Sequence, residues 1–294
     1  MIEALDNRWR RDHPLPRLEG AGDKAGRGRV LVAGGSSLAP GALLLTAEAV
    51  LRAGAGKVRI ATVEAVAIPL GLQMPEAGVI ALPSDTSGEI IAEAAPSLID
   101  QAGASQVLAF GCGMRSSDQL PGLLGDLVRG VAPATKVLLD SAAIVALRRC
   151  EQKRSLADRL VLTPHPGELA ALLDVAEDAI LADMAGTAAQ AAGEFGAVVA
   201  LKAAETVIAT PDGRVFRYEN EATGLGTAGS GDVLAGIIAG LLARGADPLT
   251  ATGWGVWLHG EAGQATARLI GPLGFLARDL LPHIPMLMAV QAQR

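Results

Sequence analysis

GRVLVAGGSSLAPGALLLTAEAVLRAGAGKVRIAT, residues 28–62, contains two short apolar runs separated by a stretch rich in Ala and Leu. Arg29–Ala33 and Lys57–Thr62 carry Val, Leu and Ile and predict strands, whereas Gly41–Ala53 predicts a helix. Strands that are apolar along their whole length are typical of a parallel sheet covered by helices on both faces. This segment therefore indicates an α/β fold.

The alternation of apolar runs and helical segments continues along the chain. Further strands are predicted at Val79–Leu82, Gln106–Phe110, Lys136–Asp140, Arg159–Thr163 and Ala197–Lys202. Thr206–Ala209 and Val215–Tyr218 predict a hairpin near one edge of the sheet, because Pro211-Asp212-Gly213 joins them. Two long helices are predicted after the hairpin, over Gly231–Ala243 and Pro248–Ile270.

We predict one three-layer α/β/α sandwich with a mainly parallel central sheet over residues 27–294. The charged residues 1–26, which also contain Gly and Pro, are predicted to form a tail or a leading helix with a loop. No polar linker or change of composition divides the chain, which favours one domain over two.

Composition and charge argue against several classes of function. The chain has 294 residues, half of them apolar, and a net charge of −6 without a dense Lys/Arg cluster, so no nucleic-acid binding is expected. Cys112 and Cys150 lie far apart, which predicts neither a disulfide framework nor a structural zinc site. The first residues read as polar rather than as a secretory signal, and the apolar stretches are interrupted well short of a membrane span. We expect a cytoplasmic protein without membrane partners.

The residues that directly follow each strand are the candidate site, because ligands of open α/β sheets bind at the carboxyl ends of the strands. These residues are small, polar or charged: Gly34-Gly35-Ser36, Gly111-Cys112-Gly113, Asp140-Ser141, Thr163-Pro164-His165-Pro166 and Lys202. Since the strands are predicted to be parallel, we expect all of these residues at the same rim of the sheet.

A glycine-rich run, Gly224–Asp232 (GLGTAGSGD), leads directly into the apolar helix Val233–Leu242. Glycines allow several backbone amides to converge, and a helix N-terminus adds partial positive charge, so the run predicts a cradle for phosphate. The run contains G-x-G-x-x-G, but it does not directly follow a strand, and it lacks the Gly-Lys-Ser/Thr of a P-loop. It therefore matches neither of these two nucleotide-binding motifs.

Asp232, in the first turn of that helix, has two possible roles. It can cap the helix, which stabilises a helix by about 1 kcal/mol. It can also take the proton from a substrate hydroxyl while the hydroxyl oxygen attacks a phosphorus held in the cradle. The glycines and Ser230 around it favour the second role. We predict an enzyme that transfers a phosphoryl group between a nucleotide and a small molecule.

The residues around Asp232 also carry a resemblance to a known family. Gly226–Gly236 (GTAGSGDVLAG) resembles the signature of the ribokinase-like superfamily. Gly28–Thr62, Leu162–Leu172 (LTPHPGELAAL) and Trp257–Gly263 (WLHGEAG) are similar to segments of the ADP/ATP-dependent NAD(P)H-hydrate dehydratases. These segments occur in the same order as in the family, and the resemblance extends over about residues 24–283. It implies a ribokinase-like fold and repair of hydrated NADH and NADPH with ADP or ATP as phosphoryl donor, together with Mg²⁺ and a homotetramer.

The resemblance also implies roles for particular residues. Asp232 would be the base on the ring hydroxyl, and Ala42, Gly113 and His165 would contact the hydrated nicotinamide substrate together with Asp232. Contacts with the adenine nucleotide are implied for Lys202, Ala203, Ala204, Glu205, Thr206, Gly229 and Gly231. No metal ligands are identified.

The chain departs from the family pattern at two positions. Arg115 stands where the pattern has the last Gly of G-P-G-L-G, and Ala203 stands where it has the Gly of K-G-A. Both changes add a side chain where backbone approaches a ligand, which can alter nucleotide affinity or substrate. These departures keep open a nucleotide-binding sensor without activity. A vitamin-precursor or sugar kinase on the same fold also stays open, because the glycine-rich run and Asp232 fit it equally well.

Several polar residues have structural alternatives of their own. Glu168 can cap the helix that begins at Pro166 or help to hold Mg²⁺ through water, and we favour capping. Asp140 can orient loop amides or a metal-bound water, or it can be structural. Lys202 is either a solvated strand end or a phosphate partner. His259, among apolar neighbours, is interpreted as structural.

Overall fold

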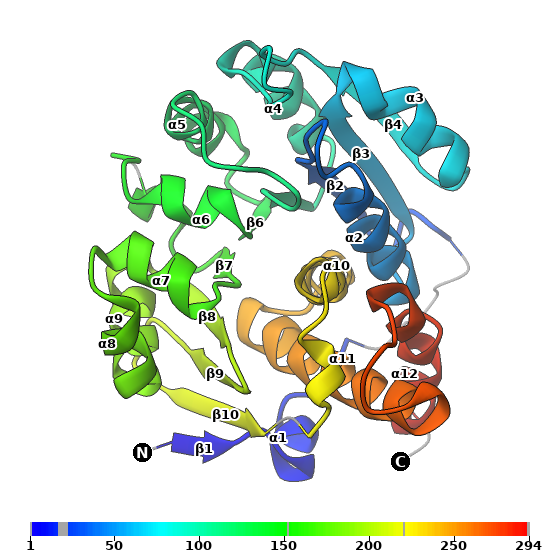
Figure 1. The fold of residues 1–294 in the computed structure, drawn as a ribbon, viewed down its shortest axis with the longest axis vertical. Helices are drawn as coiled ribbons and strands as arrows, with labels where there is room; N and C mark the ends of the chain where they lie inside the picture. Colours follow the sequence, from blue (N-terminus) through cyan, green and yellow to red (C-terminus); the bar gives the residue numbers. More distant parts are fainter. Residues whose placement is uncertain (1, 17–22, 152, 220, 293–294) are drawn as a thin grey trace.

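The computed structural model describes residues 2–16, 23–151, 153–219 and 221–292. Within these residues, ten strands form one sheet in the order β1-β10-β9-β8-β7-β6-β5-β2-β3-β4 (Figure 1). Neighbouring strands of this described sheet are parallel, except that β9 is antiparallel to both β8 and β10. The mainly parallel sheet predicted from the sequence is confirmed.

Nine of the ten described strands, all except β1, agree closely with the predicted apolar runs. They are β1 (Ile2–Ala4), β2 (Arg29–Ala33), β3 (Lys57–Val63), β4 (Gly78–Leu82), β5 (Val107–Phe110), β6 (Lys136–Leu139), β7 (Leu160–Leu162), β8 (Ala197–Lys202), β9 (Glu205–Ala209) and β10 (Val215–Glu219). The predicted hairpin is the antiparallel pair β9–β10, and it lies near one edge of the sheet.

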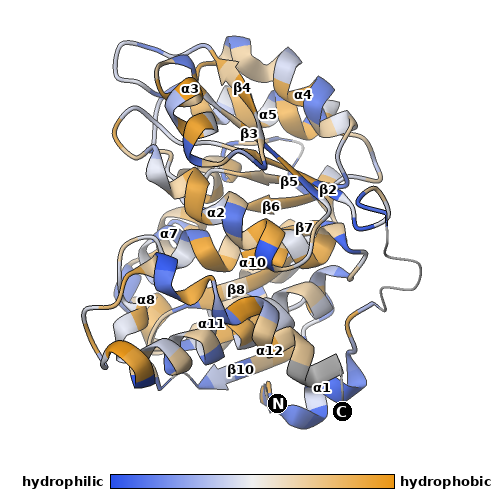
Figure 2. Ribbon diagram, turned by 90° about the vertical axis from the view of Figure 1, so that its right-hand side faces the viewer, coloured by the Kyte–Doolittle hydropathy of each residue, from blue (hydrophilic) through white to orange (hydrophobic). Residues whose placement is uncertain are grey.

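Helices cover both faces of the sheet, so the fold is a three-layer sandwich (Figure 1). One face packs against α2 (Gly41–Arg52), α3 (Glu64–Gln73), α10 (Ser230–Ala243), α11 (Pro248–Ile270) and α12 (His283–Ala292). The other face packs against α4 (Ala95–Gly103), α5 (Leu120–Gly130), α6 (Ala142–Leu147), α7 (Pro166–Leu173), α8 (Glu177–Ala182) and α9 (Met184–Phe195). Figure 2 shows the central strands in the hydrophobic colours expected for strands buried on both sides. No helix in the described ranges is long and apolar enough to span a membrane.

The strand order reverses between β2 and β5. Along the chain, β3 and β4 are added on one side of β2, and β5 then pairs with the other side. The loops that leave β2 and β5 therefore diverge at their carboxyl ends, and such a switch point is where open α/β sheets bind ligands. The fold thus places the candidate site above β2, β5 and β6.

Helices α2 and α10 pack together through small residues. A Cβ added at Gly236 would lie 2.3 Å from the backbone oxygen of Thr46 and 2.6 Å from the Cβ of Ala49. A Cβ at Gly240, one turn later, would lie 2.6 Å from the backbone oxygen of Val50. The two helices approach this closely only because glycine has no side chain. Their first turns are thereby held side by side at the rim.

The N-terminal residues contribute a strand that the sequence analysis did not predict. Ile2–Ala4 pairs in parallel with β10 and forms one edge of the sheet. Helix α1 (Asn7–Asp12) follows, and its Trp9 is buried over Gly253 of α11. Asp6 caps α1 by accepting hydrogen bonds from the backbone N–H groups of Arg8 and Trp9.

Candidate active site

The first turn of α10 presents free backbone donors at the rim. Gly229 is the N-cap residue and has φ +87°, a left-handed conformation that glycine adopts without strain. Within the described residues, the N–H groups of Gly229, Gly231 and Asp232 have no hydrogen-bond acceptor. These amides and the positive end of the helix dipole give the anion cradle that the glycine-rich run predicts.

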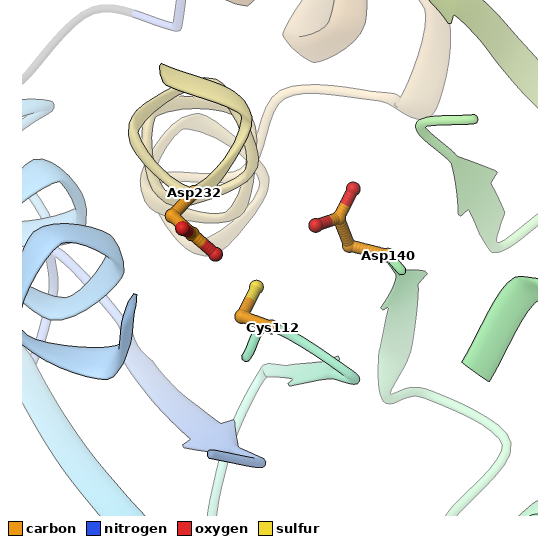
Figure 3. A group of neighbouring side chains, drawn as sticks. All are labelled: Cys112, Asp140 and Asp232. Carbon is orange, nitrogen blue, oxygen red and sulfur yellow. The ribbon is translucent and has the colours of Figure 1, made fainter. Parts of the chain in front are cut away.

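Asp232 projects from this turn toward Cys112 and Asp140 (Figure 3). The Sγ of Cys112 and one carboxylate oxygen from each aspartate all lie within 4.8 Å of one another. The Asp232 carboxylate makes no hydrogen bond or ion pair with any residue that the structure describes. It therefore does not cap α10, and the alternative that Asp232 is only a capping residue loses its support.

The environment of Asp232 raises its pKa to about 7. Burial is the main cause, and the negative charges of Asp140 and Glu168 add to it, while the ammonium of Lys202 acts in the opposite direction. A carboxyl group with a pKa near neutral pH is matched to accepting a proton from a hydroxyl and passing it on. The electrostatics thus favour a role as general base.

Asp140, Lys202 and Thr163 come from the carboxyl ends of three neighbouring strands and form a buried polar network. Lys202 Nζ lies 3.1 Å from Asp140 Oδ1, and Thr163 Oγ1 donates a hydrogen bond of 2.6 Å to the same oxygen. The Asp140 side chain is only 3% exposed and that of Lys202 is 21% exposed. The alternative that Lys202 is a solvated strand end is therefore wrong, because its ammonium is held inside the site.

Lys202 also reaches the start of α10. Its Nζ lies 3.3 Å from the point that a Cβ at Gly231 would occupy. Burial lowers the pKa of Lys202, but Asp140 and Glu168 outweigh this and leave it raised, so the ammonium stays charged. A fixed cation next to free amides suits the terminal phosphate of a nucleotide.

Ala42 and Gly113, two other predicted site residues, lie close together at the switch point. Gly113 has φ +69°, and a Cβ there would lie 2.7 Å from the Cβ of Ala42 and 2.9 Å from the backbone oxygen of Ala39. The backbone N–H of Gly35 donates to the backbone oxygen of Cys112 at 2.8 Å, which ties the loops after β2 and β5 together. Ala42 and Gly113 thus form one wall of the candidate site, where only small residues fit.

His165 caps helix α7. Its Nδ1 accepts hydrogen bonds from the backbone N–H groups of Gly167 at 3.1 Å and Glu168 at 3.4 Å, so this nitrogen carries no proton. Glu168 Oε2 accepts from the backbone N–H of His165 at 2.9 Å, which completes a capping box. The capping interpretation of Glu168 is confirmed. More than half of the His165 side chain is exposed at the rim, and its Nε2 lies 3.4 Å from Glu168 Oε1.

The remaining predicted nucleotide contacts lie at the turn between β8 and β9. Ala203 and Ala204 are exposed, and Lys202 pairs with Thr206 across the turn. Ala203 has no left-handed backbone angle, so the alanine is accommodated where the family pattern has glycine. The Glu205 carboxylate forms an ion pair of 3.4 Å with Arg217. Among these side chains, the structure brings only that of Lys202 to Asp232.

The cluster around Asp232 is compact enough for a cation but does not fit a resident Mg²⁺. Mg²⁺ prefers near-octahedral oxygen ligands, whereas Cys112 offers a soft sulfur. Burial also raises the pKa of the Cys112 thiol well above its usual value, so the thiol stays protonated. The ammonium of Lys202 on Asp140 adds a repulsive charge.

Sequence reasoning placed Cys112 and Thr163 among the rim residues that follow the strands but gave neither residue a role. Thr163 directly follows β7, and Cys112 is the second residue after β5. His259, interpreted as structural, has its Nε2 2.9 Å from Ser230 Oγ and 3.0 Å from the backbone oxygen of Ser230. Burial lowers its pKa to about 4, so it is neutral and ties α11 to the first turn of α10.

Comparison with known proteins agrees with this geometry. A family model described as NAD(P)H-hydrate dehydratase matches residues 30–286. The chain belongs to the NAD(P)H-hydrate dehydratase family. The ADP-dependent (S)-NAD(P)H-hydrate dehydratase of Xanthomonas campestris pv. campestris is 42% identical over 280 residues, covering 94% of this chain and 92% of that protein. The enzyme of the same name from Neisseria meningitidis serogroup B is 34% identical over 259 residues, 87% of this chain and 83% of that protein.

Other members of the family are longer. The bifunctional NAD(P)H-hydrate repair enzyme of Moorella thermoacetica is 41% identical over 278 residues, and the match covers 93% of this chain but 52% of that protein. The chain therefore corresponds to about half of the length of this bifunctional relative.

Among solved structures, the Bacillus subtilis ADP/ATP-dependent NAD(P)H-hydrate dehydratase co-crystallised with ATP/Mg²⁺ superimposes with a TM-score of 0.79 at 26% identity, over 98% of both chains. A ribokinase-like superfamily protein of Enterococcus faecalis gives 0.81 at 25% identity, over 95% of this chain and 93% of that one. The predicted ribokinase-like fold is confirmed.

Arg115, a departure from the family pattern, pairs with Glu89. Its Nε donates to Glu89 Oε1 at 2.8 Å, and its backbone N–H donates to Glu89 Oε2 at 3.2 Å. The Glu89 carboxylate is 3% exposed, whereas the Arg115 side chain is 51% exposed. The added side chain therefore anchors the segment Asp85–Ile90 through Glu89 and the backbone oxygen of Ser87.

Replacing Arg115 with glycine is expected to destabilise the fold by about 1 kcal/mol, because it leaves a buried carboxylate without its cation. Chemical denaturation of the wild type, Arg115→Gly, Glu89→Gln and the double variant forms a double-mutant cycle that measures the coupling. The cost of Arg115→Gly should largely disappear in the Glu89→Gln background. Strictly additive costs would show that the pair contributes nothing.

Proposed function

We propose that this chain is a nucleotide-dependent dehydratase that converts hydrated NADH and NADPH back to NADH and NADPH. One observation carries the proposal. In a member of this family, an unpartnered carboxylate with a pKa of about 7 lies beside free amides at a helix start and beside the Lys202 ammonium. Such a site can hold a transferable phosphate and take a proton from the acceptor at the same time.

The chemistry has two steps. The hydroxyl oxygen of the hydrated ring attacks the terminal phosphorus of the nucleotide, the bond from that phosphorus to the bridging oxygen breaks, and AMP (from ADP) or ADP (from ATP) leaves. Phosphate then leaves the ring carbon with its electron pair, and the neighbouring ring carbon gives up a proton as the double bond reforms. The transfer is useful because hydroxide is a poor leaving group and phosphate is a good one.

In this proposal, Asp232 takes the hydroxyl proton during the first step. The amides of Gly229 and Gly231 and the Lys202 ammonium bind the phosphate and neutralise the charge that develops on it. Ala42 and Gly113 line the place of the nicotinamide ring, and the exposed ring of His165 is available to the substrate. The turn Ala203-Ala204, with Glu205 and Thr206, lies beside the nucleotide.

Mg²⁺ enters this proposal only as a companion of the nucleotide. The Cys112 sulfur and the Lys202 ammonium do not fit a resident ion, and Mg²⁺ commonly binds through substrate phosphates while keeping several waters. No step assigned here to the residues of the chain depends on the ion.

An absorbance assay tests the proposed function. Purified protein is mixed with hydrated NADH or NADPH, MgCl₂ and either ADP or ATP, and the reduced-nicotinamide absorbance and free phosphate are followed. We expect both signals to rise together, with AMP or ADP formed in equal amount. A product that keeps the phosphate would instead identify a kinase. Tight ADP binding without turnover of hydrated NADH or hydrated NADPH would identify a sensor.

We further propose that the protein acts in the cytoplasm as a homo-oligomer, with a tetramer as the expected form. Apolar side chains at least half exposed gather near the end of α11: Leu269, Ile270, Leu273 and Leu276. Leu276 also lines a hollow of about 860 Å³ between α2 and η4 (Ala277–Leu280). Exposed apolar patches of this kind suit contacts between subunits. Light scattering of the purified protein measures the mass, and a monomer of 29.9 kDa would contradict this proposal.

A further inference from the structure

The Asp140 carboxylate is the most firmly held group of the site. Thr163 Oγ1 and Lys202 Nζ both contact its Oδ1, at 2.6 Å and 3.1 Å, and Ser141 Oγ donates to its Oδ2 at 3.1 Å. Each partner comes from a different segment, namely the end of β7, the end of β8 and the turn after β6. A carboxylate 3% exposed with three partners has one orientation, so its charge is fixed in space.

The backbone is also shaped around Asp140. Ser141 has φ 52° and ψ −134°, a conformation that costs a non-glycine residue about 1–3 kcal/mol. Gly111 has φ +115°, and a Cβ there would lie 2.1 Å from the backbone oxygen of Asp140. The turn after β6 therefore keeps a strained arrangement that points Asp140 toward Asp232, as Figure 3 shows.

Among the described residues, the cation that acts on Asp232 is Lys202, and its ammonium is paired with Asp140. Lys202 Nζ is 3.1 Å from Asp140, whereas no ion pair joins Lys202 to Asp232 within the described residues. A lysine ammonium is a flexible point charge, so without Asp140 it would be free to pair with Asp232. The ion pair leaves Asp232 available and keeps the ammonium at the start of α10.

The charged groups that face Asp232 do not cancel the effect of Asp140, because the Lys202 ammonium lowers the pKa of Asp232 by less than Asp140 raises it. Glu168 on α7 is a second negative group, and burial raises its pKa. The Cys112 thiol is protonated and His259 of α11 is neutral, so neither supplies a positive charge. A like charge within about 5 Å makes a carboxylate hold its proton more tightly.

We propose that Asp140 is a positioning residue of the reaction, which holds the Lys202 ammonium away from Asp232 and, by its own charge, keeps Asp232 basic enough to accept the hydroxyl proton. The second half of this statement rests on the proposed function. Asp140 itself touches neither the acceptor nor the phosphate in this account, and it acts through Lys202 and Asp232.

The variant Asp140→Asn tests the role of the charge, because asparagine keeps the shape and one hydrogen-bonding oxygen. With a pKa of about 7 for Asp232, kcat/KM of the wild type should rise about 30-fold between pH 5.5 and pH 8. In Asp140→Asn the midpoint should fall by at least about one pH unit, and the rise should shrink to less than about 5-fold. The matched control is Asp126→Asn, which removes a partly exposed carboxylate far from the site and should keep the wild-type profile.

A direct titration separates this inference from the proposed function. The Asp232 side-chain carboxyl is followed by ¹³C NMR in the intact protein, and its signal is assigned by its loss in Asp232→Asn. We expect the midpoint of Asp232 to fall in Asp140→Asn whether or not hydrated NADH is a substrate. An unchanged midpoint in the folded variant would overturn the inference. A shifted midpoint in a protein that repairs no hydrated cofactor would overturn only the proposed function.

A second variant covers the case in which Asp140→Asn does not fold. Thr163→Val removes the hydroxyl that donates to Asp140 Oδ1 and changes no charge. Without that donor the Asp140 carboxylate keeps two partners instead of three, so it holds the Lys202 ammonium less firmly and the ammonium can move closer to Asp232. The Asp232 midpoint should therefore again move down, by a smaller amount. A midpoint that moves up or stays fixed in Thr163→Val would contradict the role given to Asp140.

Discussion

Replacing Asp232 with asparagine is expected to lower kcat for repair of hydrated NADH by about 100-fold to 10,000-fold, with little change in the affinity for ADP. Asparagine occupies the same space but cannot accept the hydroxyl proton, and general-base catalysis contributes factors of this size. ADP binding should survive because the amides of Gly229 and Gly231 and the Lys202 ammonium remain. The absorbance assay measures kcat, and calorimetry measures ADP binding.

The stability of the same variant serves as its control. The folded protein holds the Asp232 proton with a pKa of about 7, above the ordinary value of 3.8, so the native state binds more protons than the unfolded state between these values. The wild type therefore loses stability as the pH rises from about 4 to about 7, by up to about 4 kcal/mol. Asp232→Asn avoids this loss and should be more stable than the wild type at pH 8, with no such gain below about pH 4. Thermal unfolding at both pH values checks the sign, and a variant less stable at pH 8 would contradict the burial of the charge.

The second large effect is expected at the contact between α2 and α10. Gly236→Ala should destabilise the fold by about 2–3 kcal/mol, because the new methyl group meets the backbone oxygen of Thr46 at 2.3 Å and cannot move aside. The helices must separate, and since α2 begins beside Ala42 and α10 begins beside Asp232, kcat should fall as well. Chemical denaturation measures the free energy of unfolding, and the absorbance assay measures kcat.

Gly193→Ala is the matched control for this prediction. Gly193 lies in α9, is exposed and has no heavy atom within 4 Å of an added Cβ. The same substitution there should stabilise the protein by up to about 1 kcal/mol, because alanine has a higher helix propensity than glycine. Equal effects at Gly236 and Gly193 would show that the α2–α10 contact does not depend on glycine.

The regular part of the fold could be predicted from the sequence because short apolar runs of Val, Leu and Ile belong to buried parallel strands. Residues 29–33 and 197–202 were predicted at their observed bounds for this reason. The strand Ile2–Ala4 could not be predicted, since all three residues are exposed and only pairing with β10 defines it. The order of the strands, and with it the switch point between β2 and β5, follows from tertiary packing rather than from any local pattern.

The sequence predicts that the residues after the strands share one rim of the sheet, but it does not predict the contacts among them. Asp232 and Lys202 carry a local signal, because one begins a helix after a glycine-rich run and the other ends a strand. The convergence of Cys112, Asp140 and Asp232 comes from three segments that only the sheet brings together. The capping role of His165 and the turn of Arg115 toward Glu89 depend on contacts that the sequence does not encode locally.

The central claim is that the start of α10 holds a phosphate within reach of Asp232. A crystal structure of the protein with ADP and Mg²⁺ tests it most directly. The account predicts a terminal phosphate whose oxygens accept hydrogen bonds from the amides of Gly229 or Gly231 and from Lys202 Nζ, with the Asp232 carboxylate beside it. A nucleotide whose phosphates lie elsewhere, with the α10 amides bound only to water, would contradict the account.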